Sequence, residues 1–308
     1  MIYTLTLNPS LDKSFYLPKI LNDDINRLKK VYEDPGGKGI NVAKAVKEFG
    51  GEVLALGLIG GENGKRLKHL LSEKGIPFSF VRTVGEVRLI YNIFEKKGRV
   101  IRLNEPGPRI KSEEINRLLR KITSFSYRKG DFFIISGSLP LGVKENIYQK
   151  IIKKLKGKVK IALDVDGKPG QYGVSEKPQI LKQNLYELGR LFKKKIEKKE
   201  EGISLGQRLF NSGIEKVIIS LGKEGAIGLN KEGSFWIRPP RILEKSSVGS
   251  GDFLLGGLVC SLSRGEDFLS SLRWGVAAGT ASIRYPGTQL APYDEIRKFY
   301  PSIKVIPL

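Results

Sequence analysis

The chain has 308 residues, of which 40% are hydrophobic and 28% are charged, and this composition is typical of a folded globular protein. It carries 54 Lys and Arg against 32 Asp and Glu, so its formal charge is +22. Its one histidine (His69) and one cysteine (Cys260) leave almost no ligands for zinc and no internal disulfide, and a Ser-His-Asp hydrolase would have to use His69.

Strand-like and helix-like segments alternate from one end of the chain to the other. Strands are predicted at residues 1–7, 52–59, 132–135, 159–163, 217–220 and 226–229. Helices are predicted at residues 39–49, 63–74, 143–155, 254–262 and 269–284, with Gly75 as a left-handed cap after the second. This alternation predicts an α/β fold with a doubly wound, largely parallel sheet flanked by helices. Ligands in such folds bind at the carboxyl ends of the strands.

Two stretches interrupt this alternation, at approximately residues 14–34 and 88–103. Both look extended and contain no predicted helix, so they predict a small β-layer that covers one edge of the main sheet. The sequence contains no internal repeat and no low-complexity linker, and we therefore expect a single domain over residues 1–308.

The first glycine cluster, residues 35–39, lies just before a predicted helix. Glycines at that place allow a ligand to approach backbone N–H groups, and the helix dipole favours an anion there. Lys38 and Asn41 add a cation and an amide to the same turn. A tight turn into an ordinary helix is the simpler alternative, although Gly36-Gly37-Lys38-Gly39 has more glycine than a turn requires.

The second cluster, Gly249-Ser250-Gly251-Asp252, also precedes a helix and places a carboxylate in its first turn. The backbone N–H groups of residues 249–251 are expected to hold a transferring phosphoryl group while Asp252 accepts a proton from an attacking hydroxyl. The alternative is that Asp252 only complements the helix dipole.

Two further groups are weaker signals. Ser220, Gly222 and Gly225 lie between two predicted strands, where a plain hairpin is the alternative to a binding loop. Asn184 and Glu187 lie three apart at a helix start, which suits either a magnesium ion held through water and phosphates or a simple N-cap. Neither a P-loop nor a Gly-x-Gly-x-x-Gly motif occurs in the chain.

The composition also bears on partners and location. Its lysine clusters (residues 153–154, 193–195 and 198–199) alternate with leucine and isoleucine at helical spacing, which favours solvated helix faces over a nucleic-acid surface. No segment reaches the ~18 apolar residues that span a bilayer. We expect no nucleic-acid partner, no membrane partner and, from the lone cysteine, a cytoplasmic location.

Taken together, these segments resemble the PfkB-type sugar kinases of the ribokinase-like superfamily. The likeness is greater to the branch that contains 1-phosphofructokinase and tagatose-6-phosphate kinase, and it covers essentially the whole chain. The matching segments are residues 4–12, 35–43, 85–88, 104–108, 136–140 and 249–252. The resemblance implies a ribokinase-like fold with a small β-sheet lid, and a homodimer formed through that lid.

The resemblance also implies an ATP-dependent kinase that acts on a phosphorylated ketohexose, first of all fructose 1-phosphate. It assigns Asp252 as the catalytic base and the backbone of Gly249, Ser250 and Gly251 as the anion hole. The residues implied to bind the substrate are Asp12, Gly37, Gly39, Asn41 and Ser136, with Lys38, Arg88 and Arg102 on its phosphate. The residues implied to bind ATP are Lys182, Asn184, Ser220, Gly222, Gly225 and Gly251, with Glu187 holding Mg²⁺ through water.

The sequence departs from the family pattern on the nucleotide side. Ser250 replaces the usual alanine, and Gln183 replaces a proline, which is expected to loosen the turn before Asn184. Residues 286–288 resemble relatives that phosphorylate fructose 6-phosphate. The sequence therefore leaves 6-phosphofructokinase and tagatose-6-phosphate kinase open, as well as an inactive sugar-phosphate or nucleic-acid binding protein on the same fold.

Overall fold

The computed structural model describes residues 1–28, 31–96, 99–243 and 245–308, and among these residues the strands form two sheets. In spatial order, the larger sheet consists of β14 (Lys304–Pro307), β13 (Gly233–Arg238), β12 (Ala226–Asn230), β11 (Lys216–Ser220), β10 (Ile180–Asn184), β9 (Lys160–Asp164), β8 (Phe132–Ser136), β1 (Ile2–Thr6), β4 (Val53–Ile59) and β5 (Phe78–Arg82). The smaller sheet consists of β3 (Val31–Gly36), β2 (Ser10–Leu17), β6 (Arg88–Glu95) and β7 (Val100–Asn104).

The larger sheet is parallel from β11 to β5, and β12, β13 and β14 extend it in antiparallel pairs. Its inner strand β8 is apolar up to its last residue, Ser136, and every residue of it is buried, as expected of a strand covered on both faces. The prediction of a doubly wound, mostly parallel sheet is therefore confirmed. The strand order reverses between β1 and β8, and such a reversal is where this class of fold binds its ligands.

Helices cover both faces of the larger sheet, and each face has its own apolar core. One face is covered by α1 (Lys38–Glu48), α2 (Gly61–Glu73), α8 (Ser250–Ser263), α9 (Phe268–Ser282) and α10 (Tyr293–Phe299). The other face is covered by α3 (Ser112–Thr123), α4 (Ile147–Leu155), α5 (Gly167–Val174), α6 (Leu185–Leu191) and α7 (Lys199–Asn211). No helix among the described residues is long and apolar enough to cross a membrane.

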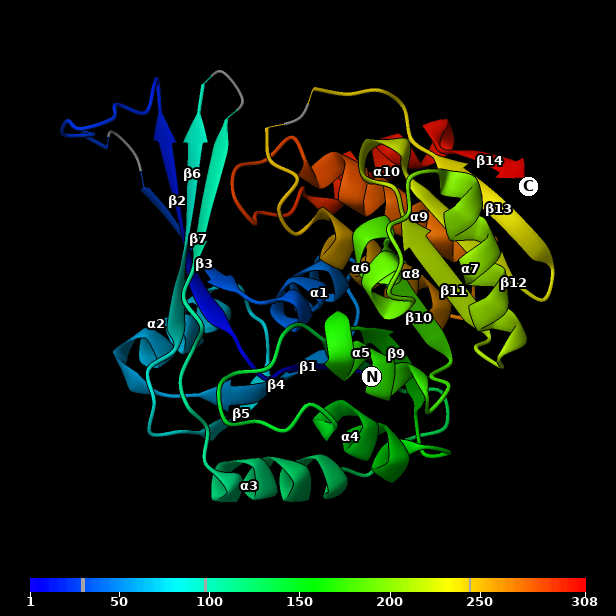
Figure 1. Ribbon diagram of the computed structural model, residues 1–308, viewed down its shortest axis with the longest axis horizontal. Helices are drawn as coiled ribbons and strands as arrows, with labels where there is room; N and C mark the ends of the chain where they lie inside the picture. The colour runs from blue at the N-terminus through cyan, green and yellow to red at the C-terminus, as the bar shows by residue number, and fades with distance from the viewer. Residues whose placement is uncertain (29–30, 97–98, 244) are drawn as a thin grey trace.

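The smaller sheet stands upright beside the α/β body (Figure 1, left). It comes from the two stretches predicted to be extended, so the prediction of a small β-layer is confirmed; residues 29–30 and 97–98 of these stretches lie outside the described residues. Strand pairing places Asp12 opposite Asp34, and Ser14 opposite Asn92, on one face, which we call the inner face. Lys13 and Tyr91 lie opposite each other on the other, outer face.

Two predicted boundaries are wrong. β2 begins at Ser10 rather than near Ser14, because the inner-face residues Ser10 and Asp12 are already buried in the sheet. The helix predicted from Val143 begins at Ile147, after a turn that Ile147 N–H closes on Lys144 O. The prediction of one domain over the whole chain stays a prediction.

Candidate active site

The candidate site lies along the carboxyl edge of the larger sheet. Ser136, Asp164, Asn184 and Ser220 are the last residues of four neighbouring parallel strands, β8 to β11. Ser136 pairs with Asp164, and Asn184 pairs with Ser220, so all four lie at one edge. The helices α1 and α8 begin next to this edge, and the sequence places a glycine cluster before each of them.

The first glycine cluster allows α1 to begin in close contact with β1 and β2. A Cβ atom at Gly36 would lie 2.1 Å from Asp12 Oδ1, and one at Gly39 would lie 2.5 Å from Thr6 Oγ1. Gly37 has a φ of 111°, which side-chain-bearing residues rarely adopt. Close packing therefore explains Gly36 and Gly39, and backbone conformation explains Gly37. The resulting turn brings Lys38 and Asn41 to the sheet edge.

The second cluster begins α8 with a left-handed residue, Gly249, whose φ is 80°. The Ser250 hydroxyl donates to Ser247 O at 3.0 Å, and the Ser250 N–H donates to the same carbonyl at 3.3 Å. The extra hydroxyl at this position is thus engaged by its own turn. A Cβ atom at Gly251 would lie 3.0 Å from Lys182 Nζ, so this ammonium lies directly over the start of α8.

Asp252 is buried in the first turn of α8 and accepts a hydrogen bond from Asn41 Nδ2 at 2.9 Å. Burial raises the pKa of Asp252 to about 6, against the opposing effect of Lys38. A carboxylate with this pKa is ionised at neutral pH and remains basic enough to accept a proton. This hydrogen bond joins the two glycine clusters, since Asn41 follows the first and Asp252 ends the second.

An ion network occupies the space between α1, β9, β10 and α6. Lys38 Nζ lies 3.0 Å from Asp164 Oδ1 and 2.8 Å from Glu187 Oε1, and Lys182 Nζ lies 3.2 Å from Asp164 Oδ2. Burial opposes charge at Lys38, yet Asp164 and Glu187 raise its pKa above the ordinary value. Burial also opposes charge at Glu187, but Lys182 and Lys38 lower its pKa to about 2. Lys38 and Glu187 are therefore both charged at neutral pH.

Asn184 forms the N-cap of α6, which is the simpler of the two alternatives that the sequence left open for this residue. Its Oδ1 accepts from Glu187 N–H at 2.9 Å, and Glu187 Oε2 accepts from Asn184 N–H at 2.9 Å, which is a complete capping box. Gln183 is a buried residue of β10 and its Nε2 donates to Val165 O at 3.1 Å. The expectation that Gln183 loosens a turn is therefore wrong, because the residue is fixed within a strand.

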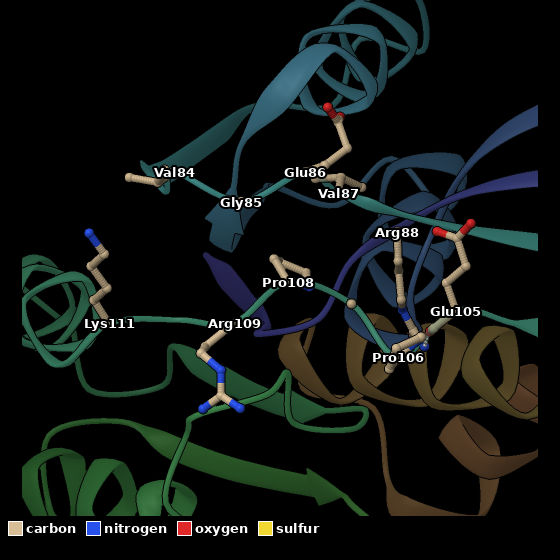
Figure 2. A pocket seen from close by; sticks show the side chains of 11 residues that line it. Val84, Gly85, Glu86, Val87, Arg88, Glu105, Pro106, Pro108, Arg109 and Lys111 are labelled. Carbon is tan, nitrogen blue, oxygen red and sulfur yellow. Dashed lines mark hydrogen bonds between the residues drawn. The ribbon is translucent and has the colours of Figure 1, made fainter.

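Arg88 lines a cavity of about 580 Å³ between the β5–β6 and β7–α3 connections (Figure 2). Its guanidinium donates to Asn8 O and to Glu105 O, both at 3.2 Å. Burial lowers its pKa, while Asp12 and Glu105 act to raise it. Figure 2 places Arg88 beside Glu105 and Pro106, with Arg109 pointing away from them. Lys38 and Arg88 were predicted to bind one phosphate together, but they contact different groups.

The remaining predicted residues lie on either side of the site. Asp12 is buried, accepts from the Ser10 hydroxyl at 2.6 Å, and has a pKa raised by burial. The Ser136 hydroxyl is buried without a partner among the described residues. Arg102 is exposed on β7, where strand pairing places it opposite Asn92.

Ser220, Gly222 and Gly225 form the hairpin connection from β11 to β12, which is the alternative that the sequence left open beside a binding loop.

Lys44 was missed by the sequence analysis, although it follows Asn41 by three residues on α1 and so shares its face. Asn8 and Glu105 were also missed, since only their backbone carbonyls hold Arg88 and no local pattern marks such a role.

Comparison with known proteins gives a consistent result. Residues 7–295 match the family described as pfkB family carbohydrate kinase. The chain is 33% identical to 1-phosphofructokinase of Borreliella burgdorferi, over 99% of this chain and 98% of that protein. It is 32% identical to ATP-dependent 6-phosphofructokinase isozyme 2 of Escherichia coli, over 97% of each. The solved structure of phosphofructokinase-2 from Escherichia coli in complex with substrates and products is similar with a TM-score of 0.92 and 30% identity, over 97% of this chain and 98% of that one.

Proposed function

Since the chain belongs to the pfkB family of carbohydrate kinases, which are phosphotransferases with an alcohol acceptor, we propose that it converts fructose 1-phosphate and ATP to fructose 1,6-bisphosphate and ADP. The observation that carries this proposal is the buried Asp252 carboxylate in the first turn of α8, oriented by Asn41 at the carboxyl edge of the sheet. A protein that only binds a sugar phosphate has no need of a basic carboxylate beside an anion site.

In the proposed reaction, a hydroxyl oxygen of the sugar forms a bond to the γ-phosphorus, and the bond from that phosphorus to the β–γ bridging oxygen breaks. Asp252 takes the proton of the attacking hydroxyl. The start of α8, with the backbone of Gly249, Ser250 and Gly251, stabilises the transferring group. Lys38 faces Asp252, Asp164 and Glu187, and we assign it to the transferring phosphoryl group rather than to the phosphate already on the sugar.

On the acceptor side, Asp12, Asn41, Ser136 and the backbone of residues 37–39 are proposed to bind sugar hydroxyls. The unpartnered, buried hydroxyl of Ser136 supports this assignment, because such a group is costly unless a ligand satisfies it. Arg88 is proposed to bind the substrate's phosphate with the N–H groups that Asn8 and Glu105 leave free, and Arg102 to approach from β7.

On the donor side, Ser220, Gly222 and Gly225 are proposed to line the nucleotide, with Lys182 and Asn184 near its phosphates. Among the described residues, no three His, Cys, Asp or Glu side chains form a metal-binding group. Both carboxylate oxygens of Glu187 are already hydrogen-bonded, which fits a Mg²⁺ ion held through water and phosphate oxygens rather than directly. Bound in this way, the ion would neutralise charge on the phosphates.

We further propose that the smaller sheet acts as a lid and that a second copy of the chain covers its outer face. Phe15 and Tyr91 stack on that face with ring centroids 6.2 Å apart, and Leu103 and Val31 beside them are 53% and 50% exposed. This apolar strip favours a homodimer, and light scattering of the wild type and of Leu103→Glu tests it.

The single cysteine, Cys260, is a buried free thiol, which supports a cytoplasmic location.

Fructose 6-phosphate is the second candidate acceptor, favoured by the 32% identity to the Escherichia coli enzyme, and tagatose 6-phosphate is the third. The test measures ADP release from MgATP with fructose 1-phosphate, fructose 6-phosphate, tagatose 6-phosphate and fructose. A clear preference for one phosphorylated sugar, abolished in Asp252→Ala, supports the kinase and identifies its substrate. If the folded wild-type protein releases no ADP with any of the four sugars, the proposed kinase activity is overturned in favour of a binding protein on the same fold.

A further inference from the structure

Lys44 is a buried cation close to the catalytic base that the reaction described above leaves without a role. It lies on α1, three residues after Asn41, and only 7% of it is exposed. Its ammonium donates to Asn41 Oδ1 at 3.1 Å, to Thr288 O at 3.3 Å and to Thr288 Oγ1 at 3.5 Å. All three contacts are to oxygen atoms, so the three N–H donors of the ammonium have partners.

The other side of the Asn41 amide faces the base. Asn41 Nδ2 donates to Asp252 Oδ2 at 2.9 Å, so the amide bridges an ammonium and a carboxylate. An ammonium can only donate and a carboxylate can only accept. The amide therefore has one favourable orientation, because the reversed one would turn its NH₂ toward Lys44 and its oxygen toward Asp252.

We propose that Lys44 is a positioning residue, which fixes the Asn41 amide so that its N–H holds the ionised Asp252 carboxylate in place for proton transfer. This inference rests on the proposed function, in which Asp252 is the base. Thr288 anchors the ammonium from the segment 286–288, so the orientation is set by two elements that are far apart in the sequence.

The surrounding charges define what the loss of Lys44 would do. Asp252 faces Lys38 and Lys44 on α1, Asp164 on β9 and Lys182 on β10. Lys44 itself faces three more groups, Asp12 on β2, Asp34 on β3 and Lys74 after α2; burial lowers the pKa of Lys44, while Asp34 and Asp12 act to raise it. Lys74 lies 3.7 Å from Asp34 and belongs to the same charge cluster without contacting Asn41, so it offers a matched control.

The test compares the wild type with Lys44→Met, Lys44→Arg and Lys74→Met. In Lys44→Met, kcat should fall by about tenfold or more, while the KM values for sugar phosphate and ATP change by less than about threefold. The acid limb of kcat should move to higher pH by at least about half a unit, because the ionised base loses both a cation and a fixed hydrogen bond. Lys44→Arg should restore the limb, and Lys74→Met should leave it in place.

A direct titration separates this proposal from the proposed function. The ¹³C carboxyl signal of Asp252, assigned with Asp252→Asn, should titrate at higher pH in Lys44→Met than in the wild type, even if the wild type phosphorylates no sugar tested. The proposal is overturned by an unshifted Asp252 titration, by a KM increase at unchanged kcat, or by an equal shift in Lys74→Met. If the melting curve shows that Lys44→Met is unfolded, the neutral variant Lys44→Gln is held to the same criteria.

Discussion

Lys38 Nζ lies 2.8 Å from Glu187 Oε1, although the two residues are 149 positions apart in the chain. Lys38 belongs to the glycine motif at the start of α1, which the sequence assigns to the sugar. Glu187 belongs to the first turn of α6, which the sequence assigns to the nucleotide. The same Glu187 carboxylate caps α6 through Asn184 N–H. The two halves of the site are therefore joined by one ion pair, and a change at either residue acts on both.

Glu187→Gln should destabilise the protein at pH 7 by about 2 kcal/mol, because Lys182 and Lys38 hold the pKa of Glu187 at about 2 in spite of its burial. A lowered pKa contributes stability above the unfolded value of 4.5, and this contribution is lost as the pH falls toward 2. The urea midpoints of variant and wild type should therefore converge below pH 4.5.

Glu197→Gln is the matched control, since Glu197 forms an exposed pair with Lys195 and should leave the urea midpoint unchanged. Equal midpoints of the wild type and Glu187→Gln at pH 7 would show that the ion pair with Lys38 contributes nothing to stability.

Asp252→Asn should have the opposite effect on stability. The pKa of Asp252 is raised by burial to about 6, so its favourable contribution is present below the unfolded value of 3.8 and is lost as the pH rises through 6. The variant should melt at a higher temperature than the wild type at pH 8, and this gain should vanish toward pH 4. A lower melting temperature of the variant at pH 8 would contradict the raised pKa.

The same variant also tests the role in catalysis. Removal of the base should lower kcat by about 10³-fold, and the wild-type kcat should fall as the pH drops through 6, where the carboxylate becomes protonated. Asp267→Asn serves as a control, because Asp267 is the N-cap of the neighbouring helix α9 and lies outside the site. A wild-type kcat that is unchanged down to pH 4.5 would exclude Asp252 as the base.

Local patterns in the sequence were sufficient to predict the layers of the fold. Apolar runs such as residues 132–135 mark strands that helices cover on both faces, and the amphipathic period of residues 63–74 marks a helix closed by a left-handed glycine. They were not sufficient for β10, in which Lys182 and Gln183 are buried. These side chains are satisfied by Asp164 and by Val165 O, which local periodicity cannot reveal.

The candidate site was predictable in part for the same reason. Both glycine clusters correctly place a helix start, because the positive φ of Gly37 and of Gly249 is a local backbone requirement that glycine meets. The partners of Lys38 and Lys44 depend on strand order and on how α1 packs against α6 and the segment 286–288, and those contacts are known only once the chain is folded.

Arg88→Lys should raise the KM for the sugar phosphate by about 10- to 100-fold with kcat within about threefold. Two of the five N–H donors of the guanidinium are engaged by Asn8 O and Glu105 O, which leaves a fixed fork for a phosphate that a lysine cannot reproduce. Arg120→Lys is the matched control, since Arg120 is exposed on α3, outside the proposed site, and should change the KM by less than about threefold. An equal KM increase in the two variants would show that the effect of Arg88→Lys does not come from a fork on the phosphate.

Tyr16→Phe should loosen the inner face of the small sheet from the body. The Tyr16 hydroxyl accepts from Gly287 N–H at 2.8 Å, and Gly287 O accepts from the Ser246 hydroxyl at 3.0 Å, just ahead of the loop that begins α8. Loss of the Tyr16 hydroxyl leaves the Gly287 N–H without its partner, at a cost of about 1 kcal/mol. Amide hydrogen exchange of Gly287 and Thr288 should accelerate by about fivefold, and the KM for the sugar phosphate should rise by a similar factor.

Tyr91→Phe controls for the loss of a phenolic hydroxyl from the same sheet, because Tyr91 lies on the outer face. It should change neither the amide exchange rate nor the KM for the sugar phosphate. If the sheet is a lid that closes over the sugar, the exchange rate and the KM must change together, since both measure how often the sheet leaves the body. Faster exchange at an unchanged KM would mean that the sheet is attached through Gly287 but does not cover the substrate. The contact with Tyr16 would then serve the packing of the segment 286–288 alone.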